Sequence, residues 1–271
     1  MKIRLLSAAI AIPIVLAFTI LGNLWFLALM IFGASISSFE ASRLLKVRGI
    51  NTNPTVSASL AGAFVASVYW IGEINISIPI FFIVCSIASL IFLVVYRSLN
   101  PSPLFRLLGT LASALYVGGA LFHAPLIREG NYGLEWLIFL MVTIILTDSG
   151  AYGVGKSFGK TPFFPSISPS KTLEGSIGGL ILGTVGAIMV SYYLSIPGVG
   201  LTVAIITGVV LSILGQIGDL AESAIKRVSG VKDSGEFMPG HGGALDRIDS
   251  IVLTVPVLYY FSYFFPKLVG T

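Results

Sequence analysis

The sequence predicts an all-α polytopic integral membrane protein, a bundle of about nine transmembrane helices with a cytoplasmic N-terminus. Three observations support this fold class. Of the 271 residues, 55% are hydrophobic and only 10% are charged, whereas about 25% are charged in a soluble domain. Apolar runs of about 20 residues, the length needed to cross the hydrocarbon, recur along the chain. The basic residues collect in alternate connections, as the positive-inside rule requires.

The N-terminal region, residues 1–130, is expected to consist of transmembrane helices. Its first apolar run follows a basic start, "MKIR", and no small-residue cleavage site with a polar segment ends it. We therefore expect a retained helix rather than a cleaved signal peptide. Pro13 is expected to kink this helix, which a bundle tolerates. The expected spans of this region are residues 5–22, 24–42, 55–72, 76–96 and 104–122.

The C-terminal region, residues 131–271, combines further apolar runs with most of the unusual polar residues. The run at 199–228 is long and ends in charged turns, so its end is expected to project out of the hydrocarbon. Pro256 is expected to kink the last helix. The expected spans are residues 134–155, 173–194, 199–228 and 249–266.

The distribution of basic residues predicts the topology. With this number of spans and a cytoplasmic N-terminus, all but two of the 16 Lys and Arg residues fall on the cytoplasmic side, the exceptions being Arg128 and Lys267. The two longest connections, residues 156–172 and 229–248, then both lie on that side. This topology accounts for the pI near 9.2, so the basic balance does not indicate a nucleic-acid partner.

Acidic residues stand close to the hydrocarbon at several expected helix ends. Asp148 follows an apolar run, and Asp219 stands similarly near the end of the run at 199–228. Asp246 and Asp249 are three residues apart at the entry to the last span. A solvated helix end is a sufficient explanation for any one of these charges. Together, on three helix ends at one face of the membrane, they indicate a shared functional site.

The residues around these carboxylates predict a magnesium ion and a phosphate ligand. One helical face carries, at i, i+3, i+4 and i+7 spacing, Asp219, Glu222, Ser223 and Lys226. Mg²⁺ is commonly held by one or two carboxylates plus substrate phosphates, and lysine or arginine neutralises phosphate oxygens. The nearby glycines allow backbone N–H groups to approach an anion. His241 is either a phosphate donor or a structural turn residue. With two histidines and one cysteine, Cys85, the chain does not indicate a transition-metal site.

The same stretch resembles the signature of the phosphatidate cytidylyltransferases, also called CDP-diacylglycerol synthases. The matching residues are Ser223, Lys226, Arg227, Lys232, Asp233, Gly235, Pro239, His241, Gly242, Gly243, Asp246, Arg247 and Asp249. Met238 and Ala244 stand where the family has larger aliphatic or aromatic residues. "SPSKTLEG" at 168–175 and "TDSGAYGVGKSFGK" at 147–160 are similar to two further family segments. The N-terminal region resembles the family only in its apolar spans.

The resemblance implies a Mg²⁺-dependent nucleotidyltransferase of phospholipid biosynthesis that transfers CMP from CTP to phosphatidate, giving CDP-diacylglycerol and pyrophosphate. It implies a multi-pass protein of the cell (inner) membrane, with residues 131–271 as the catalytic region and the active site on the cytoplasmic side. A second cation beside Mg²⁺ is left open. The implied catalytic residues are Asp219, Asp246, Lys226 and Arg247. We hypothesise that Asp219 and Asp246 hold the metal, with Asp249 and Asp148 as further or supporting ligands. The implied substrate-binding residues are Lys171, Ser223, Arg227, Lys232, His241, Gly242 and Gly243.

Two rival functions fit the composition less well. CDP-alcohol phosphotransferases also use carboxylates and Mg²⁺ at the membrane, but the chain lacks their D-x-x-D-G-x-x-A-R type of motif. A transporter would also carry acidic residues in the membrane, but here the charges collect at one face instead of lining a route across. The small-residue stretch "GSIGGLILGTVG" predicts close helix packing, either within one chain or between the two chains of a homodimer.

Overall fold

The structure, a computed structural model, is built from helices. It describes residues 2–47, 49–70, 84–85, 88–89, 91, 102–237 and 242–269. Within these ranges every regular element is helical, and an isolated β-bridge pairs Pro162 with Thr172. The chain forms two compact units. The first comprises Met1–Glu129 with Ala224–Ile248, and the second comprises Gly130–Ser223 with Asp249–Thr271.

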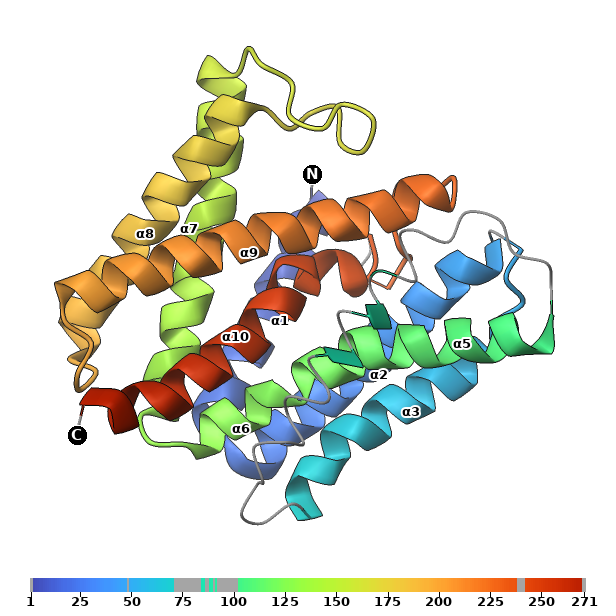
Figure 1. Cartoon of the computed structure of the whole chain (residues 1–271), viewed down its shortest axis with the longest axis horizontal. Helices are drawn as coiled ribbons and strands as arrows, with labels where there is room; N and C mark the ends of the chain where they lie inside the picture. The colour runs from blue at the N-terminus through green and yellow to red at the C-terminus, as the bar shows by residue number, and fades with distance from the viewer. Residues whose placement is uncertain are drawn as a thin grey trace. The chain divides into compact units, whose positions relative to one another are not determined.

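The first unit contains a set of packed helices. Its N-terminal elements are α1 (Lys2–Leu21), α2 (Asn23–Val47), α3 (Pro54–Ala66), the 3₁₀ turn η1 (Ser67–Trp70), α5 (Pro103–Ala114), the π-helical turn η2 (Leu115–Gly119) and α6 (His123–Glu129). Both α3 and α5 begin with a polar cap followed by proline: Asn53 accepts the N–H of Val56, and Ser102 accepts that of Phe105. Helices α2, α3 and α5 pack against one another (Figure 1).

Small residues let the helices of the first unit approach closely. The hydroxyls of Ser38 on α2 and Ser57 on α3 are 2.7 Å apart and buried. A Cβ at Gly118 would lie 2.7 Å from the Cα of Ala61 on α3, so only glycine fits at this contact. Close contacts of small residues and hydroxyl hydrogen bonds are the usual means of joining helices in lipid.

Arg128, one of the two basic residues predicted on the far side of the membrane, has a structural role. Its guanidinium donates to the carbonyl oxygens of Thr19 and Ile20, both at 2.9 Å. These are carbonyls of the last turn of α1, which have no partner within that helix. The chain turns next to them at Gly22, whose φ of +65° suits glycine. Arg128 therefore caps α1 and compensates the negative end of its dipole.

The second unit contains α7 (Gly133–Phe158) and α8 (Leu173–Leu194), with the larger part of α9 (Leu201–Val228) and of α10 (Leu245–Val269). Helices α7 and α8 lie alongside each other (Figure 1). A Cβ at Gly179 would lie 2.7 Å from the carbonyl oxygen of Thr147, and one at Gly178 would meet the side chain of Val154. The small-residue stretch of α8 thus packs within the chain, against α7.

The membrane character that the sequence predicts is confirmed by five helices among the described residues that are long and apolar enough to span. They are Asn23–Val47, Pro103–Glu129, Gly133–Phe158, Leu173–Leu194 and Leu201–Val228. Two shorter apolar helices are Ala9–Leu21 and Pro54–Tyr69. Most of the expected span 76–96 lies outside the described residues. The count of about nine spans and the side on which the N-terminus lies stay predictions.

Candidate active site

In the first unit, Asp246 organises the polar loop between α9 and α10, residues 229–244, which we call the signature loop. Its side chain is 6% exposed, and its Oδ1 accepts a hydrogen bond of 2.6 Å from the Lys226 ammonium. Its Oδ2 accepts from the backbone N–H of Gly243 at 2.7 Å and from the N–H and hydroxyl of Ser234 at 3.0 and 2.9 Å. Asp246 also stands in the first turn of α10, where a negative charge is favourable.

Lys226 comes from the last turn of α9 and is the ion-pair partner of this aspartate. Its side chain is 11% exposed. A charge-assisted hydrogen bond of this length between poorly solvated groups is among the stronger polar contacts in proteins. The structure thus brings together two residues that the sequence assigns to one site, although 19 positions separate them; both belong to the first unit.

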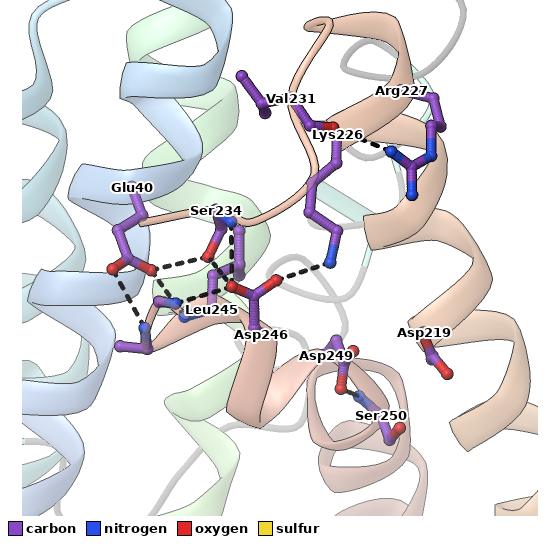
Figure 2. Close-up of polar contacts among 12 residues, drawn as sticks. Glu40, Asp219, Lys226, Arg227, Val231, Ser234, Leu245, Asp246, Asp249 and Ser250 are labelled. Atoms are coloured by element: carbon purple, nitrogen blue, oxygen red, sulfur yellow. Dashed lines mark hydrogen bonds and ion pairs between the residues drawn. The ribbon is translucent and has the colours of Figure 1, made fainter. Parts of the chain in front are cut away.

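Glu40 on α2 and Ser234 of the signature loop belong to this network, and the sequence did not single out either of them. Glu40 is 5% exposed, and its Oε1 accepts the N–H of Ala244 at 3.1 Å. Its Oε2 accepts the N–H of Leu245 at 2.8 Å and the Ser234 hydroxyl at 3.0 Å (Figure 2). The signal was present, because Glu40 is an acidic residue inside an expected membrane span, and such residues are functional by default.

Three glycines of the signature loop, Gly235, Gly242 and Gly243, lie against these two carboxylates. A Cβ at Gly235 would collide with the Glu40 carboxylate, and a Cβ at Gly243 would collide with Glu40 and the Ser234 hydroxyl. Gly242 has a φ of +82°, which an L-residue rarely adopts. The sequence predicted that glycines here would let backbone N–H groups approach an anion, and the anions they approach in the structure are protein carboxylates. Substrate contact at Gly242 and Gly243 stays a prediction.

In the second unit, Asp219 on α9 forms an ion pair with Lys171. The Lys171 ammonium lies 2.8 Å from Oδ2 of Asp219. The Asp219 side chain is 33% exposed and the Lys171 side chain is 24% exposed. The sequence placed Asp219 among the metal ligands and Lys171 among the phosphate contacts, and did not predict their pairing. Both stay predicted site residues, and in the structure the Asp219 carboxylate is paired with the Lys171 ammonium.

The connection that carries Lys171 is fastened at both ends. Glu174 in the first turn of α8 accepts the N–H of Lys160 at 3.1 Å and both the N–H and the hydroxyl of Thr161. Thr172 caps α8 by accepting the N–H of Gly175 at 3.1 Å. The N–H of Phe163 donates to the Lys171 carbonyl at 2.9 Å. These bonds fix the backbone of residues 160–172 next to the start of α8.

The other predicted carboxylates also lie in the second unit. Asp148 is exposed on α7. Oδ1 of Asp249 accepts the N–H of Ser250 at 2.6 Å. A Cβ at Gly218 would collide with the Asp249 carbonyl, so α9 and α10 are in close contact where Asp219 follows Gly218. Ser223 is 8% exposed.

The remaining predicted residues lie on or near the signature loop. Arg227, Lys232 and Arg247 are exposed, and Arg227 donates to the Val231 carbonyl at 3.3 Å. His241 lies outside the described residues. Exposed cations beside a buried carboxylate network leave their charges accessible to an anionic ligand from solution.

The donor set is compatible with magnesium. Within the part of the chain that the structure describes, no three or more His, Cys, Asp or Glu side chains gather as a metal site. Mg²⁺ rarely uses such a cage, because it keeps several waters and takes one or two carboxylates plus substrate phosphates. Asp219 and Asp246 each hold a lysine ammonium in the structure, which shows that each carboxylate favours a positive charge at its oxygens.

Comparison with known proteins identifies the kind of protein in which these residues occur together. The profile of the cytidylyltransferase family matches residues 2–265. A phosphatidate cytidylyltransferase of Bacillus subtilis is 36% identical over 264 residues, which is 96% of this chain and 97% of that protein. A Staphylococcus aureus protein of the same name is also 36% identical, over 95% of this chain and 97% of its own. One from Staphylococcus haemolyticus is 34% identical over the same shares.

These matches extend through both compact units, so they cover the signature loop, its α2 partner and the connection that carries Lys171. The resemblance found in the sequence is thereby confirmed, and the chain belongs to the cytidylyltransferase family and is a nucleotidyltransferase.

Proposed function

We propose that this protein is a phosphatidate cytidylyltransferase, which joins CTP and phosphatidate to give CDP-diacylglycerol and pyrophosphate for phospholipid biosynthesis. Relatives with that name match almost the whole chain. The single observation that carries the proposal in the structure is the largely buried Lys226–Asp246 pair, whose aspartate is also bonded to the signature loop. It supplies a fixed positive charge beside a carboxylate, as phosphoryl chemistry requires.

The reaction we propose is an in-line substitution at the α-phosphorus of CTP. An oxygen of the phosphatidate monoester forms the new bond to that phosphorus, and the bond to the β-phosphate oxygen breaks. The electron pair leaves with pyrophosphate. A phosphate monoester is ionised near neutral pH and is itself the nucleophile, so the protein need not provide a strong base. Its task is to position the two substrates and to offset their negative charge.

The basic residues are assigned to this charge neutralisation. A lysine ammonium has three donors, so Lys226 can contact a phosphate oxygen while it remains bonded to Asp246. Lys171 can act in the same way beside Asp219. The exposed Arg227, Lys232 and Arg247 are proposed as further phosphate contacts.

Mg²⁺ is the proposed cofactor. The residues proposed to hold it are Asp219 and Asp246, supported by Asp249 and Asp148. When bound, it would neutralise the triphosphate and the leaving pyrophosphate. Because CTP comes from the cytosol and phosphatidate from the leaflet, we place the reaction at the cytoplasmic boundary of the inner membrane. Long apolar helices that can span a bilayer support the membrane setting.

The test is a direct assay of the full chain in detergent. Purified protein is incubated with labelled CTP and phosphatidate, with and without Mg²⁺, and the CDP-lipid and pyrophosphate are measured. We expect both products in equal amounts, only with a divalent cation. Asp219→Asn and Asp246→Asn should each lower turnover at least about a hundredfold, as for loss of a metal ligand or an electrostatic group. Absence of CDP-lipid with every divalent cation tried would refute the proposal.

The same preparation separates the enzyme from a transporter. Reconstituted into proteoliposomes, the protein should form CDP-lipid without moving CTP or cations into the lumen. Ion or nucleotide flux without CDP-lipid formation would favour the transporter instead.

A further inference from the structure

We propose that Glu40 is a positioning residue for the reaction, which holds the signature loop closed and thereby fixes Asp246 at the start of α10. Its effect on turnover rests on the proposed function. Its contacts with the loop do not depend on that function and can be measured by amide hydrogen exchange. Glu40 belongs to α2, far from the signature loop in sequence, but both lie in the first unit.

The Glu40 carboxylate contacts both ends of the loop segment 234–245. At one end it accepts the Ser234 hydroxyl at 3.0 Å, and at the other it accepts the N–H groups of Ala244 and Leu245 at 3.1 and 2.8 Å (Figure 2). Ala244 directly precedes α10 and Leu245 is its first residue, so neither N–H group has an acceptor within the helix. One side chain on another helix thus closes the loop and caps the helix that carries Asp246.

The position requires a carboxylate of this length. Two oxygens accept three donors, and two of those donors are backbone N–H groups that cannot turn away. Glutamine would present an NH₂ group to one of them, because its amide has a single acceptor oxygen. Aspartate would keep the charge but withdraw it by one methylene from all three donors. The side chain is 5% exposed, so water cannot readily replace a lost hydrogen bond.

Ser234 links Glu40 to Asp246. Its hydroxyl lies 3.0 Å from Glu40 Oε2 and 2.9 Å from Asp246 Oδ2. A hydroxyl has one proton, so the two carboxylates share or compete for it. A cation or substrate that interacts with the Asp246 carboxylate weakens the hydrogen bonds that Asp246 accepts from Ser234 and Gly243. Glu40 then keeps the loop closed, so Asp246 can engage a ligand without the loop opening.

The experiment compares Glu40→Gln and Glu40→Asp with Ser37→Ala in the full chain in detergent. Ser37 is a matched control because it is fully buried one turn earlier on α2, and its hydroxyl has no hydrogen-bond partner among the described residues. The first readout is amide hydrogen exchange of peptides covering residues 242–249. We expect about tenfold faster exchange at Ala244 and Leu245 in both Glu40 variants and wild-type exchange in Ser37→Ala.

The second readout is steady-state kinetics against CTP and Mg²⁺. Residues that orient a metal ligand typically change metal affinity or activity by about 10–100-fold. We expect Glu40→Gln to lower kcat/KM for CTP and to raise the Mg²⁺ concentration for half-maximal activity within that range. A purely structural role would instead lower the active fraction and leave KM and the Mg²⁺ requirement unchanged.

The outcomes are separable. Unchanged exchange in Glu40→Gln, or equal acceleration in Ser37→Ala, would overturn the hold on the loop. Faster exchange with wild-type KM and Mg²⁺ requirement would overturn the positioning role. If Glu40→Gln does not fold, Glu40→Asp decides by the same two readouts. If the wild-type protein forms no CDP-lipid, the proposed function fails, whereas amide exchange still decides whether Glu40 closes the loop.

Discussion

Replacing Asp246 by asparagine should destabilise the protein by about 3 kcal/mol, apart from its effect on catalysis. The asparagine keeps the shape of the side chain but removes the charge that faces Lys226 at 2.6 Å. With the two side chains 6% and 11% exposed, the ammonium would remain poorly solvated and without its counter-charge. Breaking a buried pair in this way costs about 3–5 kcal/mol, and the partial exposure of Lys226 favours the lower end. Such a loss changes the ratio of folded to unfolded protein roughly a hundredfold.

A double-mutant cycle with Lys226→Met measures the pair itself. Free energies of unfolding are obtained by titration with SDS in mixed micelles for the wild type, both single variants and the double variant. Because the double variant leaves neither charge unpaired, it should be more stable than the sum of the single losses predicts, with a coupling of about 1–3 kcal/mol. Strictly additive losses, or an Asp246→Asn variant within about 0.5 kcal/mol of wild type, would refute the assignment of a buried pair.

Three further substitutions test the second unit. Lys171→Met should change the free energy of unfolding by at most about 1 kcal/mol, because its ion pair is partly exposed. It should lower CDP-lipid formation at least about tenfold if Lys171 is the proposed phosphate contact. Glu174→Gln leaves one acceptor oxygen instead of two for the donors of Lys160 and Thr161, so the backbone there is held less firmly. Limited trypsin digestion, followed by mass spectrometry, should therefore show faster cleavage after Lys160 than in wild type. Gly183→Ala should lower the melting temperature in detergent, because its Cβ would collide with hydroxyls of α7 and α9. Overpacking of this kind costs about 1–3 kcal/mol. The matched control is Gly200→Ala, which has open space around it and should melt as wild type.

The helices were predictable because lipid imposes one rule on every span. A backbone that crosses hydrocarbon must satisfy its own hydrogen bonds, so long apolar runs become helices. The run at 199–228 is accordingly one helix, α9, from Leu201 to Val228. Helix ends were less predictable: the run at 55–72 changes from α-helix to a 3₁₀ turn after Ala66. Hydropathy measures the length of apolar sequence and not the backbone hydrogen bonds that end a helix.

Pairing between helices was less accessible to the sequence than the helices themselves. The small-residue stretch of α8 predicted close packing but not its partner, which proves to be α7. Asp219 was assigned to the site from its place near the hydrocarbon, and Lys171 from the resemblance. Their ion pair was not foreseen. Contacts between residues so distant in sequence depend on how whole helices pack, and local periodicity does not contain that information. Lys226 and Asp246 were likewise predicted to belong to the same site, but their ion pair was not predicted.

Glu40 shows how a residue outside the signature takes part in its construction. The signature loop leads into the two backbone N–H groups of Ala244 and Leu245 at the start of α10. Within the described residues, the buried carboxylate that accepts those N–H groups comes from α2. Without it, each N–H would lack an acceptor in a poorly solvated environment, at a cost of about 1–3 kcal/mol. Exposure of these N–H groups to water would then lower the free energy of the loop. The glycines at 235 and 243 leave space for that carboxylate, so part of the signature is shaped to receive Glu40. A substitution on α2 can therefore impair the signature loop while every residue of the signature stays intact.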